Sequence, residues 1–582
     1  MKPKTQWNKV VSKTSKISHQ VLRLPYLWEG VIIFLLILAT LIINLKMIRD
    51  GLNGQVDLKW HTTWIQHFSK QLFEGIWYPR WLAGTNYGYG SPSFVFQPPL
   101  VFYLGSLLKF SGFDVQDTVI ILFSLALFLS GLNFYIYGRK KWGMVASFSG
   151  ALAYMTAPYL AFDMYWRGGL PSMFAQAWIP LIWWLTEQSL FYGQRRRGLA
   201  IAWAILALTH GPGFLLCWVI WLPYTLFFLL SRSWKAVVST IVFAGIGLGM
   251  ASIFLLPAMV EKSFLDLEYI KQQVGGIPAN LIGWGMPLFP FNRITYIFFH
   301  QSVAIIILTI LAVVCFRYSV ANGSTKQEIW YWLIFALLLA FLMSSLSEPI
   351  WQASQTLQSV QFPWRILQIF SFVGAALCAL TVREILKLPR SFRLVFSLIV
   401  VAILLANFTY SYKLSRQFIG LRNPGKANID HLQYILEIFN DPYTDKLRDY
   451  TGYRPALKNG RPSPPTPIIG QPKVSVLRGQ ANVKILLWDS YQRIFKVTAQ
   501  APSTIRIRTY YYPAWHLYIN QESHPIIMSD DGTMEFKLEP GFYEVELRYQ
   551  WTPALIGGAI LSILSVIVLF LLGRHPKLAR RR

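Results

Sequence analysis

Long apolar runs recur along this chain, and they restrict its fold more than any other feature. An α-helix needs roughly 20 apolar residues to cross the hydrocarbon core of a bilayer. Charged residues make up only 14% of the chain, against about 25% in soluble proteins. We therefore expect a polytopic α-helical membrane protein with about twelve spans, allowing for short ones. The expected spans are 29–47, 117–138, 144–161, 174–190, 198–209, 213–231, 236–256, 301–316, 329–345, 363–381, 394–412 and 553–573.

Much of the net charge of +27 lies in short loops between the runs and at the ends of the chain. If each run crosses once, the basic loops share one side with both termini, and the positive-inside rule makes that side the cytoplasm. We therefore expect an inner-membrane protein in contact with membrane lipids, with cytoplasmic termini and without a nucleic-acid partner. The first span is expected to be retained, because no small-residue cleavage site follows it. The basic segments are 1–28, 139–141, 195–197, 232–235, 317–326, 383–393 and 574–582.

Two apolar segments leave the topology open. The run at 98–108 is short and starts with Pro98-Pro99, so we expect a re-entrant or interfacial helix on the outer face. Counting it as a span would move the basic loop 139–141 outside. Only four residues, His210-Gly211-Pro212-Gly213, separate 198–209 from 213–231, which are either two spans or one broken helix. The even count of basic loops favours two.

The C-terminal third changes pattern from helical runs to strands. Ile505 and Ile507 alternate with Arg506 and Arg508, as expected of half-buried antiparallel strands. The turn Asp530-Asp531-Gly532 separates two strands. We expect a β-sandwich-like extracytoplasmic domain. The predicted division is a basic N-terminus (1–28), a membrane domain (29–412) with a long first outer loop (48–116), a helical patch at His431–Phe439 and Pro-rich linker (413–472), a β-rich domain (473–552), a last transmembrane helix (553–573) and a basic tail (574–582).

The first outer loop carries ionisable groups among aromatic residues. Asp57 follows the first span and could act as a general base, or it could be a solvated loop acid or a helix N-cap. Asp50 is the rival acid, but its position beside Gly51 is typical of a helix terminus. His61 shares a helical face with Asp57 and could donate to a phosphate, ligate a metal with Asp57, or be an interfacial histidine. Arg80 could hold a lipid phosphate or anchor the interface.

Further ionisable residues lie at the ends of spans on the same predicted outer face. Asp163, near Arg167, and His210 and Glu261 could contribute to a substrate site or simply be hydrated. Arg365 starts an apolar run, where a charge is costly unless it is paired or faces a cavity. A phosphate partner would explain Arg365, and snorkelling to the interface is the alternative.

Most of the membrane part, and most specifically its first loop, resembles a family of bacterial membrane proteins named for a 6-pyruvoyl-tetrahydropterin synthase-related domain. The family name suggests pterin chemistry, but no zinc-binding histidine triad with suitable spacing is present. The matching residues are Asp57, His61, Gly75, Tyr78-Pro79-Arg80-Trp81, Gly88-Tyr89-Gly90-Ser91-Pro92, Phe94, Phe96, Pro98-Pro99-Leu100, Pro257, Glu261 and Gln361–Arg365.

The layout also resembles the GT-C superfamily of integral membrane glycosyltransferases, and Tyr510–Asn520 is similar to C-terminal segments of related envelope-glycosylating proteins. This resemblance implies transfer of a sugar from a polyprenyl-phosphate donor, with inversion, to a lipid or polysaccharide acceptor. It places Asp57 at the position of the first-loop acid and implies substrate binding by His61, Arg80 and Arg365. The chain has no adjacent Asp-Glu or Asp-x-Asp pair, so a divalent cation at Asp57 and His61 is left open. The alternative is a non-enzymatic polysaccharide or lipid transporter, or an assembly scaffold.

Overall fold

The structure is a computed structural model of the 582-residue chain. It describes residues 5–52, 56–230, 232–265, 269, 275–287, 292–318, 323–358, 360–417, 450–456 and 465–572. Side chains are described from Leu27 onward, except at 230, 323, 324, 355 and 451. The predicted helical patch His431–Phe439 lies outside these residues, as do Pro462 and Pro464 of the predicted linker.

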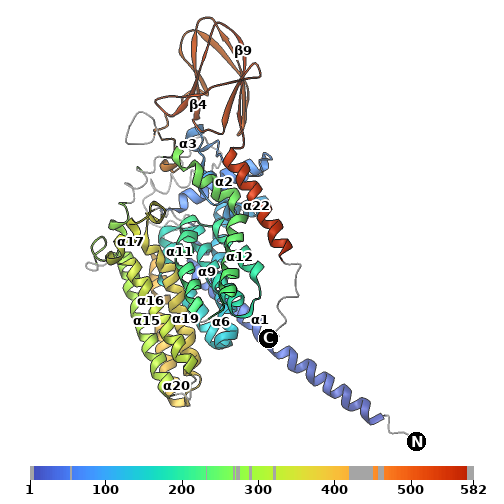
Figure 1. Ribbon diagram of the computed structural model, residues 1–582, viewed down its shortest axis with the longest axis vertical. Helices are drawn as coiled ribbons and strands as arrows, with labels where there is room; N and C mark the ends of the chain where they lie inside the picture. Colours follow the sequence, from blue (N-terminus) through green and yellow to red (C-terminus); the bar gives the residue numbers. More distant parts are fainter. Residues whose placement is uncertain are drawn as a thin grey trace.

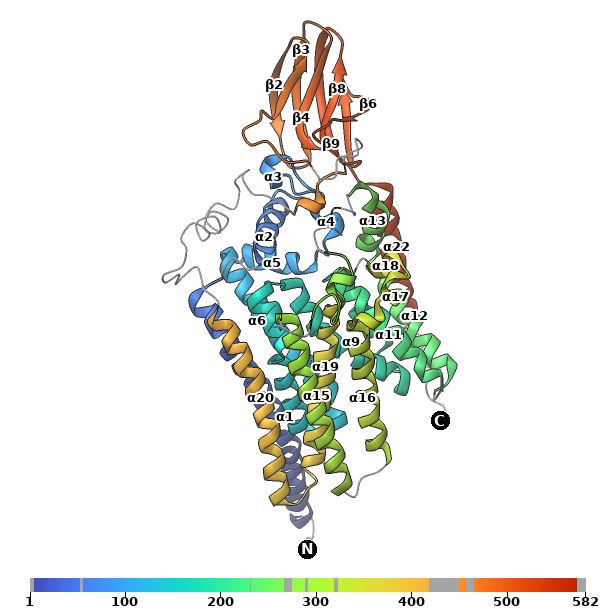
Figure 2. The same cartoon turned by 90° about the vertical axis from the view of Figure 1, so that its left-hand side faces the viewer.

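A bundle of helices forms the body of the molecule, and a β domain stands at one end of it (Figures 1 and 2). The last helix, α22, runs back from the β domain along the side of the bundle (Figure 1). The long helices are α1 (Thr5–Asp50), α6 (Val115–Trp142), α9 (Leu170–Tyr192), α12 (Trp234–Met250), α15 (Arg293–Tyr318), α16 (Gly323–Met343), α19 (Leu367–Ile385), α20 (Arg390–Arg416) and α22 (Pro553–Leu571).

The other helical elements fill the loops and the interior of the bundle. They are α2 (Leu58–Phe73), α3 (Thr85–Gly88), α4 (Ser93–Phe96), α5 (Leu100–Phe110), α7 (Met144–Met155), α8 (Pro158–Phe162), η1 (Asp163–Arg167), α10 (Arg196–Ala207), α11 (Gly211–Phe227), η2 (Phe228–Leu230), α13 (Ser252–Val260), η3 (Glu261–Phe264), η4 (Pro278–Asn280), η5 (Ser345–Ser347), α17 (Glu348–Gln352), α18 (Gln355–Gln358), η6 (Pro363–Ile366) and η7 (Thr451–Tyr453).

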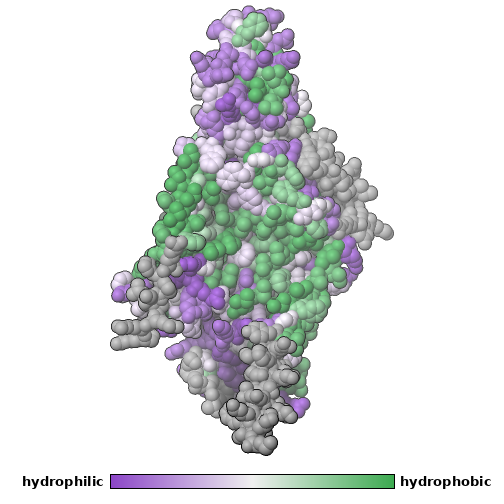
Figure 3. Space-filling view, turned by 90° about the vertical axis from the view of Figure 1, so that its right-hand side faces the viewer, coloured by the Kyte–Doolittle hydropathy of each residue, from purple (hydrophilic) through white to green (hydrophobic). Residues whose placement is uncertain are grey.

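Seven helices among the described residues are long and apolar enough to cross a membrane. An eighth results if α12 and the segment Ser252–Phe264, bent by 73° relative to each other, count as one span. The predicted spans near α7, α10 and α11 correspond to helices of 12, 12 and 17 residues, so the number of crossings stays a prediction. Figure 3 shows hydrophobic residues in a broad band across one face of the bundle, with more hydrophilic surfaces on either side of the band.

The apolar segment that begins with two prolines forms α5, which has 11 residues. A helix of that length spans about 16 Å, roughly half the thickness of a bilayer core. It packs instead on α2 of the first loop, where Phe68 contacts Phe102 and Tyr103. The first loop is therefore a folded layer between the bundle and the β domain.

Two antiparallel sheets make up the β domain, with strand orders β1-β4-β8-β7 and β2-β3-β9-β5-β6. Residues of both sheets enter one buried cluster, among them Phe495, Ile505 and Phe536. The alternation expected at 505–508 is present, because Ile505 and Ile507 are buried and the two arginines between and after them are half-buried. The strands are β1 (Val474–Arg478), β2 (Ala481–Trp488), β3 (Gln492–Ala499), β4 (Ser503–Tyr510), β5 (Trp515–Ile519), β6 (Glu522–His524), β7 (Ile527–Met528), β8 (Thr533–Leu538) and β9 (Gly541–Tyr549).

The β domain rests on the first loop. Trp81 and Tyr89 of that loop belong to the buried cluster of the β domain. The backbone N–H groups of Arg80 and Trp81 donate to the hydroxyl of Tyr491, and the Tyr510 N–H donates to the Tyr89 carbonyl at 2.9 Å. Burying large aromatic side chains from both partners makes this a fixed junction.

We predict that the close contact between α22 and α13 depends on one glycine. A Cβ on Gly558 would lie 2.4 Å from the Ser252 carbonyl oxygen, whereas a Cβ on Gly557 would meet only a Leu256 methyl carbon at 3.5 Å. Gly558→Val should therefore destabilise the protein by about 1–3 kcal/mol through overpacking, and Gly557→Val should not. The measurement is the midpoint of thermal unfolding in detergent. Equal midpoints for the two variants would contradict this packing.

Candidate functional site

Asp57 stands immediately before α2, with its backbone tied to a distant segment. Its N–H donates to the Arg167 carbonyl at 2.8 Å, and its own carbonyl accepts from the His61 N–H at 3.3 Å. The carboxylate makes no capping hydrogen bond to α2. Instead its Oδ2 accepts from Arg167 Nε at 2.8 Å, and the side chain remains 30% exposed. Among the described residues, Oδ1 has no hydrogen-bond partner, so one oxygen is left to accept a proton.

Arg167 continues this ion pair to a second carboxylate. Its Nη1 lies 3.1 Å from Oδ1 of Asp163, a side chain that is fully buried. The other oxygen of Asp163 accepts from Ser172 Oγ at 2.6 Å and Gln176 Nε2 at 2.8 Å. Both carboxylate oxygens of Asp163 are therefore occupied by protein donors, which suits a positioning role. The guanidinium of Arg167 is held between the two acids.

The turn that presents Asp163 and Arg167 is η1, a single π-helical turn between α8 and α9. It ends at Gly168, whose φ of 70° belongs to the left-handed region that glycine adopts readily. Single π turns widen a helix locally and occur often at functional sites. Here the widened turn directs Asp163 and Arg167 to the same side.

Arg365 lies near this chain of charges but pairs with none of them. Its side chain is buried, Nη1 donates to the Val360 carbonyl at 3.0 Å, and the guanidinium stacks 4.7 Å from the Phe362 ring centroid. The Nε atom is buried without a partner. Arg365 interacts electrostatically with Asp57, Asp163 and Arg167. Within the part of the chain that the structure describes, it makes no ion pair with a carboxylate.

Two buried histidines complete this cluster, and both are neutral at pH 7. Burial lowers the pKa of His61 to about 4, with Asp57 acting against the shift. Its Nδ1 is buried without a partner. Burial also lowers the pKa of His210, which precedes α11. His210 Nδ1 accepts the Gly213 N–H at 3.1 Å, so its proton lies on Nε2.

Aromatic side chains from the segment after the bundle cover the first loop. Tyr450 lies 6.4 Å from Trp60, and Tyr453 lies 6.1 Å from Trp64, measured between ring centroids. Tyr450 also interacts electrostatically with Asp57 and Arg365. The segment 450–456 therefore closes one side of the polar cluster.

Arg80 and Glu261 form a second, separate cluster. Arg80 Nη2 lies 3.2 Å from Glu261 Oε2, and both side chains are almost fully buried. The carboxylate also accepts from the hydroxyls of Tyr512 in the β domain and Thr552 before α22. This junction joins the first loop, η3, the β domain and the last helix, so it fixes the β domain on the bundle.

The structure thus divides the sequence-predicted residues into two groups. Asp57, His61, Asp163, His210 and Arg365 share one electrostatic cluster, while Arg80 and Glu261 lie in the junction. Asp50, the rival acid, is buried and ion-paired with Lys46 and Arg49. Sequence reasoning missed Ser172, Gln176 and Tyr450. Of these, only Ser172 had a sequence signal, its closeness to the Asp163–Arg167 turn.

The surroundings of Asp57 bear on the predicted divalent cation. Among the described residues, no group of three or more histidine, cysteine, aspartate or glutamate side chains is arranged to hold a metal. A cation at Asp57 would lie against the guanidinium of Arg167. We therefore assign no step to a metal, and the cation predicted at Asp57 and His61 stays a prediction.

A family model described as "6-pyruvoyl-tetrahydropterin synthase related domain; membrane protein" matches residues 94–415. This range is more than half of the chain. It includes Asp163, His210, Glu261 and Arg365 and begins after Asp57, His61 and Arg80. Comparison with curated proteins gives no match.

Three solved structures illustrate what the chain is similar to. Arabinofuranosyltransferase AftD from Mycobacteria has 14% identity and a TM-score of 0.39. The similarity covers 67% of this chain but only 27% of the length of AftD. Oligosaccharyltransferase AglB from Archaeoglobus fulgidus, solved with an inhibitory peptide and a dolichol-phosphate, has 14% identity and a TM-score of 0.41, covering 75% of this chain and 61% of its own. ArnT from Cupriavidus metallidurans, bound to undecaprenyl phosphate, has 12% identity and a TM-score of 0.29, covering 72% of this chain and 89% of its own.

The Arg80–Glu261 junction should be required for stability. Glu261→Gln leaves Arg80 buried without its counter-charge, so we expect a loss of about 3–5 kcal/mol. Glu544→Gln is the matched control, because its pair with Lys496 is 3.9 Å long and both side chains are more than half exposed. Thermal unfolding of the purified protein in detergent measures both. A Glu261→Gln protein as stable as Glu544→Gln would contradict the assignment.

The burial of His61 predicts a pH dependence of stability. In the unfolded chain the histidine binds a proton below about pH 6.5, but in the folded chain it does so only near pH 4. Stability should therefore fall as the pH falls from 6.5 to 4, by at most about 3 kcal/mol from this residue. His61→Gln should reduce the dependence of the unfolding midpoint on pH, and the part that remains is expected from His67 and His210, whose pKa values burial also lowers. The exposed His524 provides the control variant His524→Gln, which should leave that dependence unchanged.

Proposed function

We propose that this chain, which belongs to the 6-pyruvoyl-tetrahydropterin synthase-related family of membrane proteins, is a membrane glycosyltransferase. It moves a sugar from a polyprenyl-phosphate donor to a cell-envelope acceptor. The observation that carries the proposal is that one cluster holds both a candidate base and a buried cation. Asp57 offers a partly exposed carboxylate, and Arg365 offers a buried cation that has no carboxylate partner among the described residues. A sugar leaving a phosphate needs both groups.

Asp57 is the proposed base. Arg167 holds Oδ2 and so orients the carboxylate, while Oδ1 has no partner in the described part of the chain. An acceptor hydroxyl bound there would donate its hydrogen to Oδ1, within the reach that general-base catalysis requires. Asp163 supports this arrangement indirectly, since it holds the other side of Arg167.

Arg365 is the proposed binding group for the donor phosphate. A buried guanidinium is costly unless an anion compensates it, and a phosphate would do so with two parallel hydrogen bonds. Its unpartnered Nε atom supports this role. His210, with its proton on Nε2, and His61 are neutral groups of the same cluster that can hydrogen-bond to the phosphate or the sugar.

The reaction follows from these roles. The acceptor oxygen forms a bond to the anomeric carbon while its proton passes to Asp57 Oδ1. The bond between the anomeric carbon and the phosphate oxygen breaks, and its electron pair leaves with the phosphate. Arg365 stabilises that charge. Attack opposite to the leaving phosphate inverts the anomeric carbon, and the proton on Asp57 then returns to water.

The proposed orientation puts this cluster and the β domain outside the plasma membrane. Basic residues at the other end of the bundle support it, because they lie where the positive-inside rule expects the cytoplasm. Arg139, at the end of α6, pairs there with Glu29 of α1. Arg383, at the end of α19, pairs with Glu328.

Replacement of Asp57 tests the proposal. A strain without this chain should lose one envelope glycan and accumulate the corresponding polyprenyl-phosphate sugar. Asp57→Asn should fail to restore the glycan, with transfer reduced at least about 100-fold, since general-base catalysis contributes about 10²–10⁴-fold. Mass analysis of envelope glycans and lipid-linked sugars measures both quantities.

The same substitution elsewhere controls for indirect effects. Asp530 is exposed in a turn of the β domain, so Asp530→Asn should restore the glycan fully. Immunoblotting of membranes checks that all variants are present at equal levels. Full restoration of the glycan by Asp57→Asn would refute the assigned base, and an unchanged glycan profile in the deletion strain would refute the transferase.

A further inference from the structure

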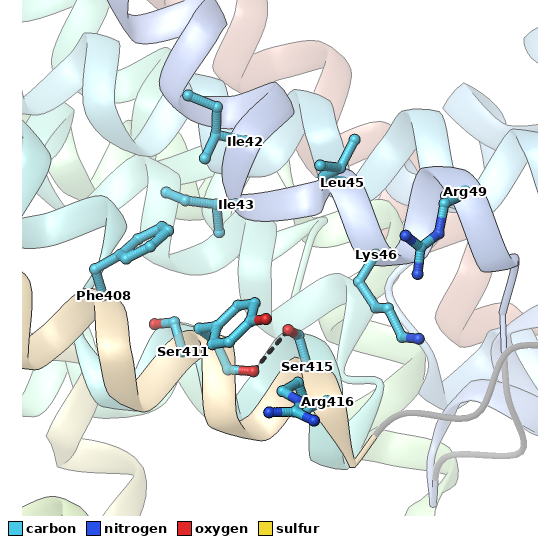
Figure 4. Close-up of a pocket in the computed structure, with 10 residues that line it drawn as sticks. Ile42, Ile43, Leu45, Lys46, Arg49, Phe408, Ser411, Ser415 and Arg416 are labelled. Carbon is cyan, nitrogen blue, oxygen red and sulfur yellow. Dashed lines mark hydrogen bonds between the residues drawn. The ribbon is translucent and has the colours of Figure 1, made fainter.

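A groove lies between the ends of α1 and α20 nearest the β domain, outside the cluster described above. Its cavity volume is about 560 Å³, within the range of small-molecule sites. Figure 4 shows side chains of both helices pointing into it. The lining residues are Ile42, Ile43, Leu45, Lys46, Arg49, Phe408, Ser411, Tyr412, Ser415 and Arg416.

Three cations stand at one end of this groove. Lys46 and Arg49 extend from α1, and Arg416 extends from α20 (Figure 4). Asp50 is buried and pairs with both Lys46 and Arg49, so it cancels one of the three charges. Arg416 makes no ion pair among the described residues. The groove therefore carries a net charge of two positive units at this end.

The rest of the groove is apolar and opens on helices that face lipid. Ile42, Leu45 and Phe408 supply its hydrocarbon lining, and the first two are each about half exposed. Both α1 and α20 qualify as membrane spans with most of their surface unburied. A charged end next to an apolar channel along a span is complementary to an anionic head group with an acyl or prenyl tail.

The groove shares a wall with the proposed reaction centre. The Tyr165 hydroxyl donates to the backbone carbonyl of Ile43, which lines the groove. Tyr165 belongs to η1, the same turn that carries Asp163 and Arg167. A lipid in the groove would therefore lie one layer of protein away from Arg167.

We propose that this groove binds a polyprenyl phosphate monoester, the carrier lipid that remains after the sugar has left. This identity rests on the proposed function. Once the sugar has left, the carrier phosphate changes from a diester with one negative charge to a monoester with about −1.5 to −2 charges at pH 7. The net charge of the groove matches the monoester better than the diester. The groove thus selects the discharged carrier over the loaded donor.

Native mass spectrometry of the purified full-length protein tests this proposal. The protein is incubated separately with undecaprenyl phosphate, with the diester phosphatidylglycerol and with zwitterionic phosphatidylcholine, and bound lipid is counted. Undecaprenyl phosphate should bind most. Arg416→Gln should lower its occupancy about tenfold, which corresponds to about 1.4 kcal/mol, and Arg416→Lys should retain it.

A cation at the opposite end of the same helix provides the matched control. Arg390 is exposed at the start of α20, and Arg390→Gln should leave binding unchanged. Equal binding of the three lipids, equal binding by Arg416→Gln and wild type, or an equal loss in Arg390→Gln would each overturn the proposal. No sugar or acceptor is present in this assay, and Asp57→Asn should bind the lipid normally. A failed transfer reaction and an absent lipid site are therefore distinguishable.

Discussion

The guanidinium of Arg167, held between Asp57 and Asp163, is the interaction on which the arrangement of this end of the bundle depends. Its side chain is only 12% exposed, and a charge so buried is tolerated only with compensating partners. One partner comes from the first loop and the other from the same π turn. The Asp57 N–H also donates to the Arg167 carbonyl. The acid proposed as the base is therefore positioned by the same bonds that dock its loop.

A second buried ion pair performs a different task at the same end. Arg80 and Glu261 connect segments 181 positions apart in the chain, and the hydroxyls of Tyr512 and Thr552 complete the junction. Glu261 supplies the counter-charge for the buried guanidinium of Arg80, whose Nε and Nη1 atoms are themselves buried without a partner. Arg365 differs from Arg80 because it forms no ion pair with a carboxylate among the described residues. The presence or absence of a paired carboxylate thus separates a structural ion pair from a candidate anion site.

Sequence patterns predicted the parts of this fold that are set by local composition. Long uniform runs correspond to α1, α6, α15 and α20, and alternation identified the strands at 505–508. The region from α7 to α13 was harder, because helices surrounded by protein need not have 20 apolar residues. For the site, too, local composition indicated some residues but not their long-range partners. Asp57 and Arg365 were notable as charges beside apolar runs, but the pairing of Arg167 with Asp57 joins positions 110 residues apart. Ser172 and Gln176 are uncharged, so composition gave them no prominence.

The π turn η1 contacts both the wall of the groove and the proposed reaction centre. Tyr165 reaches the backbone of α1 beside the groove, while Arg167, two residues later, reaches Asp57. A π turn is rare and occurs often at functional sites. A lipid in the groove would lie against the part of α1 that Tyr165 contacts, two residues from the guanidinium that orients Asp57. Because Arg167 orients the carboxylate of Asp57, one turn of backbone supports both the wall of the groove and the proposed base.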